Sequence, residues 1–177
     1  MSEAIAEPRD EALEAARWDL QPLVHGKGPA GVGELLDEAQ READAFAERY
    51  RGRVGELDAA ALAAAMRELE SISDLVGRAG SYAALDFSTA TQDPARGALM
   101  QDAQERGAAL QTTLLFFDLE WNELPDEQAE RLIAAEELSF CRHYLATMRR
   151  YRPHQLSEPE ERVLTETDVT GRAAFKR

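Results

Sequence analysis

Apolar residues recur at intervals of three and four positions along most of the chain. The first clear series follows Glu34 and consists of Leu36, Ala39, Ala43, Phe46 and Tyr50. This spacing places the side chains on one face of a helix. It predicts a helix from Glu34 to Tyr50, which Gly52 and Gly55 end because glycine favours helix termination.

A second series predicts a longer helix that begins after Asp58, whose side chain suits the N-cap position. Its apolar members are Leu62, Met66, Leu69, Ile72, Val76, Ala79, Ala83 and Phe87. The stretch Gly77–Ala84 is rich in glycine and alanine. Small residues allow another helix to approach closely, so we expect tight packing there, with a hinge as the alternative.

The pair Asp93-Pro94 predicts the start of a third long helix, since it combines a capping carboxylate with proline at the first helical position. The apolar face of this helix consists of Leu99, Ala103, Leu110, Leu114, Phe117 and Trp121. We expect the helix to end near Leu124-Pro125, because the residue before a proline is displaced from helical geometry.

Three shorter helices are predicted after this point. The first opens at Pro125-Asp126-Glu127 and contains Leu132 and Ile133. The second is marked by Phe140, Tyr144, Met148 and Tyr151 and is stopped by Pro153. The third begins at the capping box Ser157-Glu158-Pro159-Glu160 and runs through Val163 and Leu164 to Gly171.

The remaining segments carry no regular pattern. Residues 23–33 contain four glycines and a proline, which predicts a loop, and residues 1–17 are polar and rich in alanine. No segment alternates between apolar and polar residues with a period of two, so no sheet is expected. The predicted fold class is all-α: an antiparallel helical bundle of three long helices plus several shorter ones.

Composition narrows the classes of function. The 177 residues suffice for one domain or a compact pair of helical subdomains. The net charge of −14 argues against binding to nucleic acid and to anionic membrane surfaces, because like charges repel. A single cysteine, Cys141, allows no intrachain disulfide. The sequence shows no signal peptide and no apolar run near the ~20 residues that cross a bilayer, so a cytoplasmic protein is expected.

A search for a metal site finds no suitable ligand spacing. The three histidines are His25, His143 and His154, and no H-E-x-x-H motif is present. Cys141 and His143 are two positions apart on a predicted helix, so their side chains point about 200° apart and cannot share an ion. We expect no catalytic, cofactor-binding or metal-binding residue in this chain.

Other chemical motifs are also weak. The sequence has no G-x-S-x-G motif, and the glycines between Gly26 and Gly33 lack the preceding strand and the Gly-Lys-Ser/Thr ending of a phosphate-binding loop. The one basic cluster is Arg149-Arg150-Tyr151-Arg152. It lies at a predicted helix C-terminus, where positive charge is favourable. A binding role for this cluster is the alternative.

Several segments nevertheless match a known pattern in their order and spacing. They are Arg17–Leu20, Gly80–Ala83, Asp93–Arg96, Leu115–Glu120, Tyr151–Glu161 and Val169–Phe175. From about residue 17 to the end, the chain resembles the N-terminal region of the oligoendopeptidase F family of zinc metallopeptidases, which is distantly similar to thimet oligopeptidase. The most specific segments are Leu156–Glu161 and the Thr170-Gly171 pair.

The resemblance implies a helical N-terminal lobe over residues 17–171, preceded by a flexible segment, residues 1–16. Residues 172–177 would begin a helix that leads into a missing catalytic domain, so that the chain is either a truncation or a natural short product. In the family the zinc-binding H-E-x-x-H lies far downstream. The resemblance therefore implies that zinc is held by the missing domain and that this chain is inactive alone.

The implied role of the lobe is to help enclose the channel that admits short peptides. Its implied partners are the catalytic domain of the same polypeptide and, in the full-length enzyme, an oligopeptide substrate. Weak self-association of the chain is a further expectation, through apolar residues near Val169 and Phe175. The alternative is a free-standing helical scaffold or protein-interaction module without enzymatic activity.

Overall fold

The protein is described by a computed structural model that covers residues 18–168 and residue 171. These residues form helices and no strand, which confirms the all-α class. The long helices are α2 (Pro29–Tyr50), α3 (Ala59–Thr89) and α4 (Pro94–Glu123), and the shorter ones are α5 (Asp126–Ala134), α6 (Arg142–Arg150) and α7 (Glu158–Asp168). The described 3₁₀ turns are η1 (Gln21–Val24), η2 (Val54–Glu56), η3 (Glu136–Leu138) and η4 (Arg152–His154).

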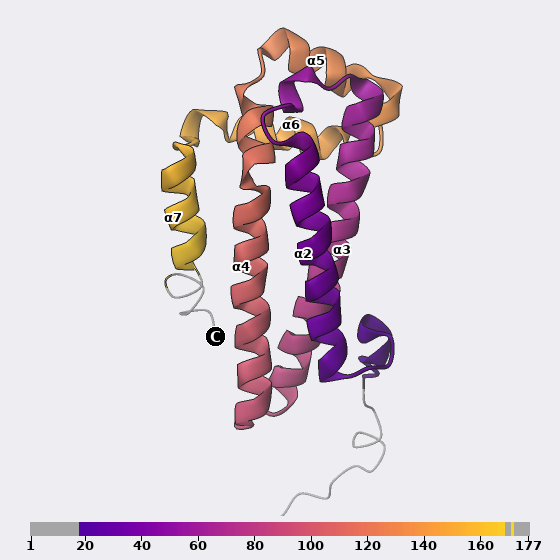
Figure 1. Cartoon of the computed structure of the whole chain (residues 1–177), viewed down its shortest axis with the longest axis vertical. Helices are drawn as coiled ribbons and strands as arrows, with labels where there is room; N and C mark the ends of the chain where they lie inside the picture. Colours follow the sequence, from indigo (N-terminus) through magenta and orange to yellow (C-terminus); the bar gives the residue numbers. More distant parts are fainter. Residues whose placement is uncertain (1–17, 169–170, 172–177) are drawn as a thin grey trace, which may run out of the picture.

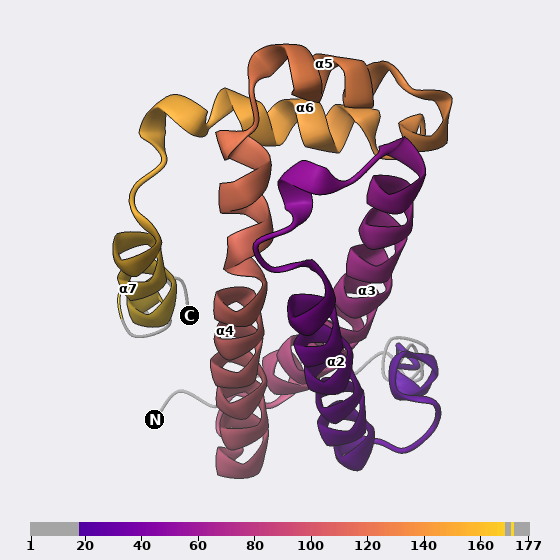
Figure 2. The ribbon, with the colours of Figure 1, turned by 45° about the horizontal axis from the view of Figure 1, so that its top comes forward.

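The three long helices lie side by side, and the chain reverses its direction between them (Figure 1). Helices α5 and α6 cross one end of this group, and α7 lies along the outer side of α4. Figure 2 shows α6 spanning the space between the ends of α4 and α3. The core between the helices includes the ring of Phe46, whose centroid is 5.6 Å from that of Phe117 and 6.0 Å from that of Phe116.

Local capping sets the starts of α3 and α4, as predicted. The Asp58 carboxylate accepts a hydrogen bond from the Ala61 backbone N–H at 2.8 Å. The Asp93 carboxylate accepts one from the Ala95 backbone N–H at 2.9 Å. The predicted end of α4 is also confirmed, because the helix stops directly before Leu124-Pro125.

The start of α2 differs from the prediction. We expected a loop over residues 23–33, but η1 ends at Val24 and α2 begins at Pro29. Proline suits the first helical position, and Gly31 is buried where η1 packs against the first turn of α2. A Cβ atom on Gly31 would lie 2.6 Å from the Val24 carbonyl oxygen. The glycine therefore permits close packing inside a helix instead of breaking it.

The buried face of α6 also differs from the predicted one. The series Phe140, Tyr144, Met148 and Tyr151 was expected to mark this helix, but its three aromatic side chains are exposed. The residues that α6 and its approach bury are Leu138, Cys141 and Leu145. The buried face is thus rotated, because α6 packs on the end of α4 and on α5, while the preceding turn η3 packs on α3.

The small-residue segment of α3 has a buried side and an open side. Ala79, Tyr82 and Ala83 are buried. A Cβ atom added at Gly77 or Gly80 would have no described neighbour within 4 Å. The close packing in this segment therefore comes from its alanines and not from its glycines.

Within residues 18–168, no helix combines the length and the apolar character that a membrane span requires. The predicted segments 1–16 and 172–177, together with Val169, lie outside the described residues.

Candidate functional site

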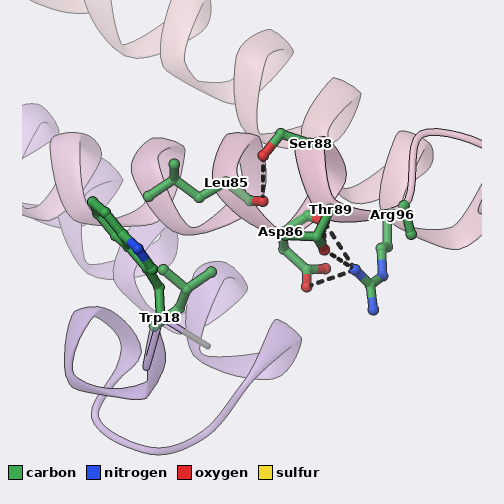
Figure 3. Close-up of a pocket in the computed structure, with 8 residues that line it drawn as sticks. Trp18, Leu85, Asp86, Ser88, Thr89 and Arg96 are labelled. Carbon is green, nitrogen blue, oxygen red and sulfur yellow. Dashed lines mark hydrogen bonds and ion pairs between the residues drawn. The ribbon is translucent and has the colours of Figure 1, made fainter. Parts of the chain in front are cut away.

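A cavity of about 650 Å³ lies between the segment that precedes α2 and the C-terminal end of α3 (Figure 3). Its lining consists of Trp18, Leu20, Leu85, Asp86, Ser88, Thr89, Ala90 and Arg96. The apolar wall is formed mainly by Trp18, which is 86% exposed, and by the leucines. The opposite wall is polar, so the cavity has two chemically different sides.

The polar side chains of this wall stabilise the turn between α3 and α4. Arg96 Nη1 donates to the Asp86 carbonyl oxygen at 2.9 Å and to the Thr89 hydroxyl. Its guanidinium also pairs with the carboxylates of Asp86 at 3.4 Å and Asp93 at 3.6 Å. The Ser88 hydroxyl donates to the Leu85 carbonyl oxygen at 2.7 Å. None of these described groups forms a nucleophile–base pair. Their hydrogen bonds and ion pairs join the end of α3 to the start of α4.

The three histidines and the cysteine have separate surroundings. Nη2 of Arg78 donates to Nε2 of His25 at 2.9 Å, and His143 and His154 are exposed. Cys141 is buried with its Sγ atom 3.7 Å from the Leu138 carbonyl oxygen, and burial raises the pKa of its thiol. Among the described residues, no group of three or more histidine, cysteine, aspartate or glutamate side chains is placed to hold a metal ion.

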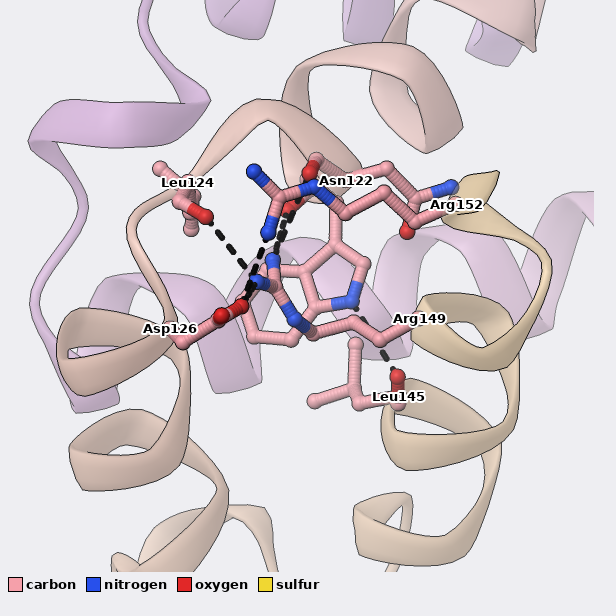
Figure 4. A network of polar contacts seen from close by, with 7 residues as sticks. Asn122, Leu124, Asp126, Leu145, Arg149 and Arg152 are labelled. Atoms are coloured by element: carbon pink, nitrogen blue, oxygen red, sulfur yellow. Dashed lines mark hydrogen bonds and ion pairs between the residues drawn. The ribbon is translucent and has the colours of Figure 1, made fainter. Parts of the chain in front are cut away.

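The basic cluster holds helix ends together (Figure 4). Arg149 donates from Nη1 to the Trp121 carbonyl oxygen and from Nη2 to the Leu124 carbonyl oxygen, both at 3.0 Å. It also pairs with the Asp126 carboxylate, which accepts a second hydrogen bond from Arg152 at 2.8 Å. Arg149 thus satisfies free carbonyl groups at the C-terminus of α4, and Arg152 supports it through the shared Asp126 carboxylate.

Residues 120–177 match the family model of oligopeptidase F. The chain is similar to the N-terminal region of this family. The match confirms the resemblance over the end of α4 and over α5, α6 and α7. No curated protein and no solved structure matches the chain.

Within the matched segment, residues 120–177, helix α7 begins with the predicted capping box. The Glu160 carboxylate accepts a hydrogen bond from the Ser157 backbone N–H at 3.0 Å and another from the Ser157 hydroxyl. Both hydrogen bonds stabilise the charged carboxylate and lower the pKa of Glu160. The hydrogen bonds and the ion pair of Arg149 lie in the same segment. The matched segment is therefore stabilised by interactions between its own residues.

Asp118 is a candidate residue that sequence reasoning missed, because one carboxylate among 34 acidic residues gives no signal. It lies on α4, two positions before the segment that matches the family model, residues 120–177. Its side chain reaches solvent, yet the surrounding helices displace enough water to raise its pKa to about 6. Burial and the charge of Asp118 also raise the pKa of Tyr144, which belongs to α6. Asp118 and Tyr144 belong to α4 and α6, which contact each other.

Proposed function

We propose that this chain is the non-catalytic N-terminal helical domain of an oligoendopeptidase F-like zinc metalloendopeptidase that hydrolyses short peptides. The observation that carries the proposal is the family match over residues 120–177. In this proposal zinc is held by the H-E-x-x-H motif of a catalytic domain in the same polypeptide. The enzyme acts in the cytoplasm.

The role proposed for the domain is to help enclose the substrate channel. A cavity of about 290 Å³ beside α3 supports this role, because its lining includes exposed aromatic side chains that a peptide can contact. These are Phe140 and Tyr144, which line the cavity together with residues of α3. A channel wall of this kind restricts the size of the peptide and leaves the chemistry to the other domain.

The test compares two polypeptides. One is this chain, and the other is the product of the complete reading frame, which should contain H-E-x-x-H downstream. With a quenched fluorescent oligopeptide, we expect hydrolysis by the longer product and its loss on addition of a chelator, with no turnover by residues 1–177 alone. A reading frame without the motif, or chelator-sensitive hydrolysis by the chain alone, would contradict the proposal.

A second candidate is a free-standing helical scaffold or interaction module. It is favoured by one observation: residues 18–119, which hold α2, α3 and most of α4, lie outside the family match and contain most of the buried core. The same reading frame separates the two candidates. A stop codon shortly after residue 177 and a stable monomeric product would support the scaffold.

A further inference from the structure

A groove lies between α3 and α4 and is bordered by α7. It holds a cavity of about 270 Å³, lined by Val76, Gly80, Ala84, Met100, Ala103, Gln104, Gly107, Ala108, Gln111, Thr165 and Asp168. A Cβ atom at Gly80 would have no described neighbour within 4 Å, and one at Gly107 would lie 4.0 Å from Cγ1 of Val76. The two helices thus run close together here and leave a hollow where these glycines lack side chains.

The groove continues into a second cavity, of about 590 Å³, at the C-terminal end of α7. Gln111, Thr165 and Asp168 line both cavities, and Gly171 lines the second one. The Gly171 backbone N–H donates to the Thr167 carbonyl oxygen at 2.8 Å, which fixes Gly171 to the last turn of α7. The chain therefore leaves α7 at the mouth of the groove.

Apolar side chains along both cavities are incompletely covered. Val76 of α3 and Met100 of α4 are only partly buried, and Leu164 of α7, which lines the second cavity, is 54% exposed. Such surface is stabilised when another apolar side chain removes it from water. The volume of the groove suits one large side chain, since typical pockets for small molecules run from about 300 to 1,000 Å³.

We propose that the side chain of Phe175 occupies this groove, so that residues 172–177, which lie outside the described part of the chain, fold back over α3 and α4. Phe175 follows Gly171 by four positions, and an extended chain of that length spans about 13 Å. Gly107 is four positions before Gln111 on α4, a rise of about 6 Å from the mouth of the groove. The phenyl ring can therefore reach the hollow beside Val76.

The composition of residues 172–177 matches this location. Phe175 is their one large apolar residue, and the segment carries three basic side chains and no acidic one, whereas the whole chain has a net charge of −14. Asp168 lines both cavities, and the described last turn of α7 contains no basic residue. Positive charge is favourable at the C-terminus of a helix, so the basic side chains would stabilise this end of α7.

The first experiment relies on the 177-residue wild-type chain. Nuclear magnetic resonance with methyl-labelled valine and alanine detects nuclear Overhauser effects between the Phe175 ring and the methyl groups of Val76 and Ala108, which line the groove. Phe175→Ser identifies these cross-peaks by their loss. We expect both contacts within one chain. Their absence, or contacts that arise only between labelled and unlabelled chains in a mixture, would overturn the proposal, the latter in favour of a second copy in the groove.

A matched pair of glycine variants gives the second test. Gly80→Leu fills the groove, whereas Gly77→Leu adds the same side chain to α3 at a position that lines neither cavity. A Cβ atom at either glycine would have no described neighbour within 4 Å, so both helices should tolerate the change.

Tryptic cleavage of the bond after Arg172 measures release of the segment, because a protease needs the segment free of the folded surface. We expect Gly80→Leu and Phe175→Ser to speed this cleavage about tenfold, because each removes the burial of one phenyl ring, and Gly77→Leu to leave the rate unchanged. Equal rates for the two glycine variants, or an unchanged rate in Phe175→Ser, would overturn the proposal. These contacts lie within this chain, so the outcome is separate from the test of the proposed function.

Discussion

At the scale of single residues, Gly31 shows how a missing side chain lets two segments meet. It is buried in the first turns of α2, and a Cβ atom there would lie 2.6 Å from the carbonyl oxygen and 2.7 Å from the Cβ atom of Val24. Val24 is itself fully buried, so it has little room to move. A Cβ atom at Gly33, two positions further along, would have no described neighbour within 4 Å.

This pair of glycines gives a matched prediction. Gly31→Ala should lower the free energy of unfolding by about 1–3 kcal/mol, because overpacking forces the backbone of η1 or α2 to shift. Gly33→Ala should raise it by about 0.5–1 kcal/mol, because alanine favours the helix and the site is open. Urea denaturation of both variants checks this. Similar effects of the two substitutions would show that η1 does not press on α2 at Gly31.

The raised pKa of Asp118 predicts that the stability of the fold depends on pH. Its folded-state pKa of about 6 lies above the ordinary value of 3.8, so the folded protein binds the proton more tightly than the unfolded chain. The resulting stabilisation is fully present below about pH 4 and is lost as the pH rises through about 6. The shift alone corresponds to about 3 kcal/mol, but the side chain reaches solvent, and screening should reduce the effect to about 1 kcal/mol.

Asp118→Asn should remove this dependence. Between about pH 4 and about pH 7.5 the wild-type chain should lose about 1 kcal/mol of stability relative to the variant, measured by denaturation at each pH. Glu130→Gln serves as the control, since Glu130 is exposed on α5 and should leave the difference between the two pH values unchanged. Parallel curves for wild type and Asp118→Asn would mean that Asp118 is fully hydrated.

At the scale of elements, Arg149 joins three helices at one point. Its side chain extends from α6 to the last carbonyl groups of α4 and to Asp126 at the start of α5. Only 12% of the side chain is exposed, so these hydrogen bonds are largely shielded from water. The adjacent Arg150 is exposed and makes no hydrogen bond or ion pair with the described residues.

Removal of this connection should be costly. Arg149→Ala should lower the free energy of unfolding by about 2–3 kcal/mol, because it leaves shielded carbonyl groups without a donor. Arg150→Ala should change it by no more than about 0.5 kcal/mol. Thermal and urea unfolding of both variants provide the measurement. Equal stability of the two would show that water replaces Arg149 at the end of α4.

At the scale of the whole molecule, α7 is attached differently from the other helices. None of its described residues is buried, and Val163 and Leu164 are more than half exposed. It lies along α4, and its first turn is linked to the end of α2 through the ion pair between Glu158 and Arg51 at 3.3 Å. An exposed ion pair of this kind contributes little, about 0–1 kcal/mol.

We therefore expect α7 to open before the helices of the core. In hydrogen exchange of the 177-residue chain, backbone amides of α7 should exchange much faster than those in the middle of α2, α3 and α4, because few apolar contacts must break to expose them. Amides of α6 near the buried Leu145 serve as the reference within the same matched segment. Equal protection of α7 and α6 would contradict this expectation.

The sequence by itself determined the fold class and most helix ends. Asp58 and Asp93 start their helices through hydrogen bonds to residues two or three positions away, and Pro125 ends α4 through its own ring. Such interactions act within one turn, so they can be predicted from neighbouring residues. The three-and-four spacing in α3 and α4 was equally informative, because each of these helices has a continuous buried face.

Only the tertiary structure decided which residues meet across the chain. The start of α2 depends on Val24 packing against Gly31. The buried face of α6 depends on its contacts with α4 and α5, where Leu145 rather than Tyr144 is buried. The contacts of Arg149 and the surroundings of Asp118 likewise come from elements more than 20 positions away. The shielding of Arg149 and Asp118 from water depends on which helices pack around them, and the neighbouring residues in the sequence do not specify that packing.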